Sequence, residues 1–165
     1  VDDDRKGLFA AAEAYWPGPA GVFRVGMWVH TGDHTRLDSK AGADRNLGAY
    51  LSLDRRVGRG TANLRLGAAD PTVSRAARFV SLAYARSLGV VTFGAGVGRT
   101  YLSETGRTAR QGDVTQAELY LRFPLTGALS MSPSVQWLDN SGFDASGERF
   151  DPHQVLLGLR FDYRF

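Results

Sequence analysis

The C-terminal segment of this chain alternates between apolar and polar residues over its last twelve positions. The apolar positions, counted back by twos from the end, are Phe165, Tyr163, Phe161, Leu159, Leu157 and Val155. The positions between them include Arg164, Asp162 and Arg160. Successive side chains of a β-strand point to opposite faces, so the pattern predicts a strand with one apolar and one charged face. An apolar face that ends on terminal aromatic residues is typical of a bacterial outer-membrane β-barrel, in which lipid covers one face and water the other.

The same alternation recurs in eight earlier segments, so the sequence predicts about nine antiparallel strands and an all-β fold. The predicted strands are 8–16, 22–30, 47–54, 62–68, 80–84, 91–98, 116–123, 129–137 and 154–165. Short turns follow the first, third, fifth and seventh of them, and long polar loops follow the second, sixth and eighth. Short turns on one rim and long loops on the other indicate a transmembrane barrel whose short-turn rim faces the periplasm.

Composition excludes several other classes of protein. No run of about 18 apolar residues is present, which excludes a transmembrane helix, and the absence of cysteine excludes disulfides and thiolate metal sites. The net charge of +3 is a mild excess, and the basic residues are scattered over all the predicted strands. A nucleic-acid-binding protein would be expected to cluster them, so we expect no nucleic-acid partner.

Strand parity indicates that this chain is the C-terminal portion of a larger barrel. If the ninth strand ends at the short-turn rim, the first begins at the long-loop rim, outside the cell. Single-chain bacterial barrels have an even number of strands with both ends in the periplasm, so residues 1–7 are interpreted as the tail of an extracellular loop. We therefore treat residues 1–165 as a single β-barrel domain whose two edge strands pair with strands outside this sequence. The competing interpretation is a small complete barrel of eight strands in which 8–16 is not a strand.

Several segments resemble the carbohydrate-selective porins of the OprB type. The similar stretches follow the family order and are 23–33 (FRVGMWVHTGD), 46–54 (NLGAYLSLD), 116–126 (QAELYLRFPLT), 130–138 (SMSPSVQWL) and 155–161 (VLLGLRF). They correspond to the C-terminal half of the family, and the turn at 86–90 is shorter than the family's and lacks its acidic residue. The resemblance implies an outer-membrane porin of about sixteen strands that passes sugars or other small hydrophilic solutes and that can assemble as a homotrimer.

Candidate solute-contacting residues are the polar and aromatic side chains that share the inward parity. Sugars carry many hydroxyl groups, and their recognition needs carboxylate, amide and guanidinium partners together with aromatic faces, at an affinity low enough for release. The candidates are Glu13, Arg24, Trp28, Tyr50, Asp54, Arg65, Glu118, Tyr120, Arg122, Gln136 and Arg160. The opposite parity predicts lipid contact for Phe23, Val25, Phe93, Leu119, Phe123, Val135, Leu157 and Phe161. For any single polar residue, the alternative is a structural ladder of salt bridges that holds neighbouring strands in register.

The other chemical motifs are weaker. His30, Asp33 and His34 include metal-ligand types, but they lack a fourth ligand at a set spacing, so we expect no metal and no other cofactor. The glycines of 94–98 alternate along a predicted strand, where they would admit bulky side chains from neighbouring strands. No serine is tied by pattern to one of the three histidines, so we expect no enzyme. The functional alternatives to a porin are a non-conducting barrel that serves as an anchor or export element of a secretion or surface-assembly system and, less favoured, a soluble lipocalin-like binder.

Overall fold

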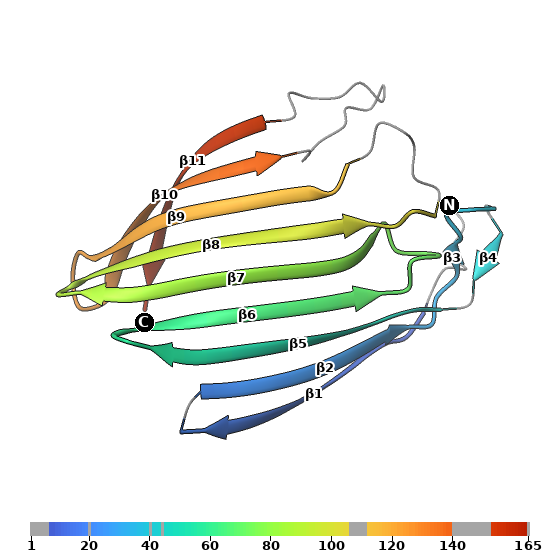
Figure 1. Cartoon of the computed structure of the whole chain (residues 1–165), viewed down its shortest axis with the longest axis horizontal. Helices are drawn as coiled ribbons and strands as arrows, with labels where there is room; N and C mark the ends of the chain where they lie inside the picture. Colours follow the sequence, from blue (N-terminus) through green and yellow to red (C-terminus); the bar gives the residue numbers. More distant parts are fainter. Residues whose placement is uncertain are drawn as a thin grey trace.

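The described part of this computed structural model is one curved antiparallel sheet of nine strands that follow one another in chain order (Figure 1). It comprises residues 7–19, 21–39, 41–43, 45–105, 112–139 and 153–164. The strands of the sheet are β1 (Phe9–Gly18), β2 (Gly21–His30), β5 (Asn46–Val57), β6 (Gly60–Ala69), β7 (Ala76–Leu88), β8 (Val91–Leu102), β9 (Val114–Pro124), β10 (Leu129–Asp139) and β11 (His153–Tyr163). Within these residues no helix is long and apolar enough to cross a membrane.

All nine predicted strands are confirmed, and most of them are longer than the sequence pattern indicated. The largest difference is at β7, because Arg78 and Arg86 interrupt the apolar positions near both ends of the strand, whereas its pairing with β8 continues past them to Ala76 and Leu88. Phe165 lies outside the described residues, and β11 ends at Tyr163. The backbone N–H of Arg164 then donates to the carbonyl of Ala128 at 2.8 Å, which ties the end of β11 to the short turn before β10.

The connections between strands follow the predicted alternation of short and long. Gly58 and Gly89, in the short turns after β5 and β7, have φ values of 57° and 65°, in the left-handed region that glycine adopts without strain. The long connection between β2 and β5 contains a small hairpin of β3 (His34–Thr35) and β4 (Gly42–Ala43). The sequence pattern did not predict this hairpin, because two-residue strands are too short to show a periodicity.

The register of the sheet separates an apolar face from a polar face. Across β2, β5 and β6, Phe23 lies opposite Leu53, which lies opposite Leu64. One position along, Asp54 of β5 lies opposite Asn63 of β6. Across all nine strands the ladders pair apolar-face residues with apolar-face residues and polar-face residues with polar-face residues, except at a register shift between Ala76 and Arg78 at the start of β7. The residues predicted to contact lipid all fall on the apolar face.

The apolar face has no protein partner within the described residues. None of their apolar side chains is buried, and Leu157, Leu119 and Phe161 are 85%, 50% and 58% exposed. A soluble sandwich would cover such a face with a second sheet, because exposing contiguous apolar surface to water is unfavourable. Lipid is the environment that such a face requires.

The two edges of the sheet are unpaired within the described part of the chain. The segment 9–18 is a strand, contrary to the eight-strand alternative, and it pairs only with β2, whereas β11 pairs only with β10. No ladder among the described residues joins β11 to β1 or to β2.

Candidate functional site

All eleven predicted solute-contacting residues lie on the polar face of the sheet. Their positions follow from the register, in which Glu13 lies opposite Gly26, Arg65 opposite Ser52, and Gln136 opposite Glu118. They are distributed over β1, β2, β5, β6, β9, β10 and β11. The polar face is also hollowed, since three cavities are lined mainly by residues of this face. Contact with a solute remains a prediction for each residue.

One group of these residues forms a network of hydrogen bonds between strands. The guanidinium of Arg24 on β2 forms an ion pair with Asp54 on β5. Asn63 on β6 donates to the same carboxylate at 2.5 Å and to the Ser52 hydroxyl at 3.2 Å. These bonds join three adjacent strands through their side chains. The ladder interpretation therefore applies to Arg24 and Asp54.

A second contact of this type involves Glu13 and Tyr50. The Tyr50 hydroxyl donates to a carboxylate oxygen of Glu13 at 2.6 Å, although β2 lies between their strands. This reach is possible because Gly26, the β2 residue opposite both side chains, has no side chain of its own. A Cβ atom on Gly26 would overlap the Tyr50 ring.

Glycines on the polar face receive aromatic rings from neighbouring strands at two further places. A Cβ on Gly48 would lie 2.6 Å from the indole nitrogen of Trp28, and a Cβ on Gly94 would overlap the Tyr120 ring. Each ring lies flat along the wall, over the glycine of the adjacent strand. The predicted role of the β8 glycines is therefore confirmed at Gly94.

A large hollow on the polar face lies between β6 and β10 and has a volume of about 500 Å³. Its floor consists of small residues, Ala83, Gly96 and Gly98, on the two central strands β7 and β8. Arg65 borders it on the β6 side, and Glu118 and Gln136 border it on the side of β9 and β10. Three strand spacings separate β6 from β9, which corresponds to about 14 Å.

Arg65 and Glu118 differ from the network residues because neither makes a hydrogen bond or ion pair with another described residue. Charged side chains without a protein partner must be solvated by water or by a solute. Arg160 is in the same situation, whereas Arg122 donates to the Ser130 hydroxyl at 2.9 and 3.0 Å. The structure thus divides the predicted set into wall residues and residues whose polar groups are available.

Sequence reasoning missed several polar or aromatic residues of the large hollow, and three of them lie outside the network described above. They are Phe79, Ser81 and Gln116. The Phe79 ring leans over the floor, since its Cε2 atom would lie 3.3 Å from a Cβ on Gly98. Phe79 shares the polar parity but is apolar, and this combination is the signal that could have identified it. An aromatic face beside amide and charged groups is the usual composition of a carbohydrate site.

The histidines at the end of β2 form a pair. His30 Nδ1 and His34 Nε2 are 3.0 Å apart, and the rings meet edge to face. Asp33, which lies between them in the sequence, is exposed. No group of three or more metal-ligand side chains occurs among the described residues.

The loop that contains β3 and β4 carries an ion pair outside the strands of the wall. Arg36 donates to both carboxylate oxygens of Asp38 at 2.9 and 3.1 Å, and the Ser39 hydroxyl donates to one of them at 2.9 Å. These hydrogen bonds, that from Arg36 above all, lower the pKa of Asp38 from 3.8 to about 2.

Comparisons with known proteins agree on the fold and the family. The model of the carbohydrate-selective porin, OprB family, matches residues 7–165. A structure of OprB from Pseudomonas putida at high pH matches with a TM-score of 0.82 and 14% sequence identity, over 96% of this chain and 49% of that chain. This chain thus spans about half the length of the solved porin. No curated protein sequence matches it. Because the family match extends over almost the whole sequence, the chain belongs to the OprB family of carbohydrate-selective porins, proteins of the bacterial outer membrane.

Proposed function

We propose that the polar face lines a water-filled channel through which sugars and other small hydrophilic solutes diffuse passively. The observation that carries this proposal is the large hollow, in which Arg65 and Glu118 border a floor of small residues and make no hydrogen bond or ion pair with another described residue. Family membership supports the same solute class. We propose a channel and not an enzyme, because the polar groups of the hollow are suited to transient binding.

Passage of a sugar through such a channel needs many weak contacts in place of one strong contact. Guanidinium, carboxylate and amide groups on opposite sides of the hollow can exchange hydrogen bonds with successive hydroxyls, while Phe79 contacts the apolar face of the ring. A site that binds tightly would retain the solute and slow its passage. The floor of Gly96, Gly98 and Ala83 keeps the cross-section open.

The chain supplies only part of the proposed channel. The unpaired edges at β1 and β11, and the coverage of about half of the solved porin, support our prediction of a larger barrel of about sixteen strands. The strands that complete it and assembly as a homotrimer are predictions. Mass measurement of the protein extracted in mild detergent would distinguish a monomer from a trimer.

The test is single-channel recording in planar bilayers combined with sugar uptake into vesicles. Replacing both free charges, Arg65→Gln with Glu118→Gln, should alter conductance and change the rate of glucose uptake several-fold. The matched control is Arg56→Gln, at a polar-face position that does not line this hollow, and we expect it to change uptake little. If the double variant folds and transports as the parent does, Arg65 and Glu118 are only wall residues.

The same recording distinguishes a porin from the second candidate function, a non-conducting anchor or export element. A porin gives a steady ion current, whereas a plugged barrel gives none. Replacing Arg122 together with Glu118 would be less decisive, because Arg122 also stabilises the wall through Ser130.

A further inference from the structure

Arginines gather at the short-turn end of the polar face on β9 and β11. Arg122 lies near the end of β9, Arg160 lies on β11, and Arg164 follows β11 directly. Two carboxylates line the hollows here among the described residues. One belongs to Asp162, and the other belongs to Glu118, which lies nearer the middle of the wall. This end of the wall therefore carries an excess of positive charge.

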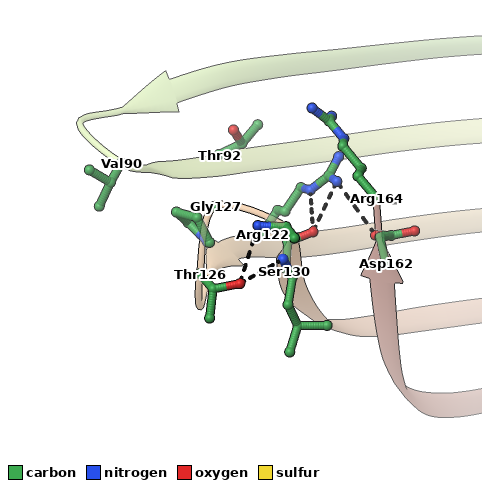
Figure 2. A pocket seen from close by; sticks show the side chains of 11 residues that line it. Val90, Thr92, Arg122, Thr126, Gly127, Ser130, Asp162 and Arg164 are labelled. Atoms are coloured by element: carbon green, nitrogen blue, oxygen red, sulfur yellow. Dashed lines mark hydrogen bonds and ion pairs between the residues drawn. The ribbon is translucent and has the colours of Figure 1, made fainter.

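A hollow of about 270 Å³ lies among these groups, and Figure 2 shows it from close by. Arg122 and Arg164 line it from two strands, and the hydroxyls of Thr92, Thr126 and Ser130 line it as well. In Figure 2 the side chain of Arg164 rises on the same side of the sheet as that of Arg122. A neighbouring hollow that shares Thr92, Arg122 and Asp162 is lined by Arg160.

The arginines differ in how far protein groups engage them. Arg122 is oriented by Ser130 and lies 3.7 Å from a carboxylate oxygen of Asp162. The guanidinium groups of Arg160 and Arg164 make no hydrogen bond or ion pair with a described residue. Asp162 can neutralise only one arginine, so the remaining positive charge is available to a ligand.

The chemistry of this group favours one class of solute. Guanidinium presents a planar fork of N–H donors that matches the oxygens of a carboxylate or phosphate, and such charge-assisted hydrogen bonds are stronger than neutral ones. The nearby hydroxyls can donate to the same anion or to the hydroxyls of a sugar ring. Neutral sugars do not require an excess of positive charge, whereas sugars that carry an acidic group do.

We propose that this hollow and the neighbouring one lined by Arg160, near the short-turn rim of the wall, together form an anion-binding site that takes the carboxylate or phosphate of an acidic sugar during its passage. The proposal rests on the proposed channel function and adds a solute class to it. Arg160 and Arg164 supply the free charge, and Arg122 supplies a guanidinium that is already held in place. The neighbouring hollow shares Glu118 and Gln136 with the large hollow, but neither of the two rim hollows shares an arginine with it.

The test compares glucuronate with glucose, which differ in the carboxylate, on the full-length protein. We expect glucuronate to bind in detergent, by calorimetry, and to slow ion current through single channels. In the variant Arg160→Gln with Arg164→Gln, both effects should require about tenfold more glucuronate, a loss larger than any change in glucose uptake. Arg164→Lys should retain an intermediate affinity, and it provides a second variant if the double variant folds poorly.

The matched control is Arg56→Gln. Arg56 has the polar parity and lies near the short-turn end of β5, but it lines neither of the two hollows. If Arg56→Gln weakens glucuronate binding as much as the double variant does, a diffuse positive rim explains the effect and the site is refuted. Equal glucuronate affinity in the parent and the double variant would also overturn the proposal.

Competition with inorganic phosphate shows whether the site recognises the anionic group or the sugar ring. We expect phosphate to compete with glucuronate, because guanidinium groups bind either anion. Absence of competition would contradict an anion site. The calorimetric measurement does not depend on transport, so failure of this site can be distinguished from failure of the channel function. A protein that transports glucose but binds no glucuronate refutes the anion-binding site and leaves the channel function standing.

Discussion

Gly94→Ala should destabilise the barrel wall, because Tyr120 occupies the space above Gly94. A methyl group at this position would overlap two ring carbons, so the ring must rotate away from the wall into the channel. Overpacking of this kind costs about 1–3 kcal/mol. The same methyl group on Gly96 would meet its nearest atom, the Cβ of Ala83, at 3.4 Å, an ordinary contact.

Gly96→Ala is therefore a matched control on the same strand and the same face. Replacing glycine by alanine within a strand also gains about 0.5–1 kcal/mol of backbone entropy, and this gain applies to both variants. The difference between their free energies of unfolding isolates the overlap and should equal about 1–3 kcal/mol.

The assay is equilibrium unfolding of the refolded protein in lipid vesicles by urea, with extrapolation to zero denaturant. Adding Tyr120→Ala to Gly94→Ala should recover much of the loss, because the methyl group then has room. Conductance of Gly94→Ala should also fall as the ring enters the channel. Equal stability of the Gly94→Ala and Gly96→Ala proteins would refute the reasoning.

Two further predictions concern the faces of the wall and an exposed loop. Leu82→Arg, at the middle of β7 on the apolar face, should lower the free energy of unfolding in vesicles by about 2–4 kcal/mol, whereas Ser81→Arg on the polar face should lower it little. Similar losses of stability in the two variants would contradict the assigned faces. Pairing with Arg36 lowers the pKa of Asp38, so its carboxylate stays ionised and paired at every pH above that pKa. As the pH falls, the Arg36–Asp38 pair should therefore persist through the ordinary pKa range of aspartate and open only near the pKa of about 2. Carbon NMR of the Asp38 carboxyl group measures this, and a midpoint near 4 would show that the pair does not form.

The strands and their faces could be predicted from the sequence because each strand has one apolar and one polar side. This requirement produces an alternation of apolar and polar residues with a period of two. The alternation is visible even in β8, where glycines occupy most of the polar-face positions. The length of β7 was underestimated because the alternation weakens at Arg78 and Arg86, where the ladder itself continues.

The division of the polar residues into wall and channel groups could not be predicted in this way. It depends on which residues of different strands lie opposite one another, and parity alone does not fix that register. The contact between Glu13 and Tyr50, 37 residues apart, also needs the glycine between them. Phe79 was missed because the predicted strand 80–84 began one residue after it, whereas β7 begins at Ala76.

The central claim is that the polar face borders water and the apolar face borders lipid. The chain has no cysteine, so spin labels can be attached singly at Glu118→Cys and Leu119→Cys, neighbours near the middle of β9. Electron paramagnetic resonance in vesicles then compares collisions with oxygen, which concentrates in lipid, and with a water-soluble nickel complex. The account predicts that the label at 118 collides mainly with the nickel complex and the label at 119 mainly with oxygen. The reverse result, or equal exposure of both labels to the nickel complex, would contradict it.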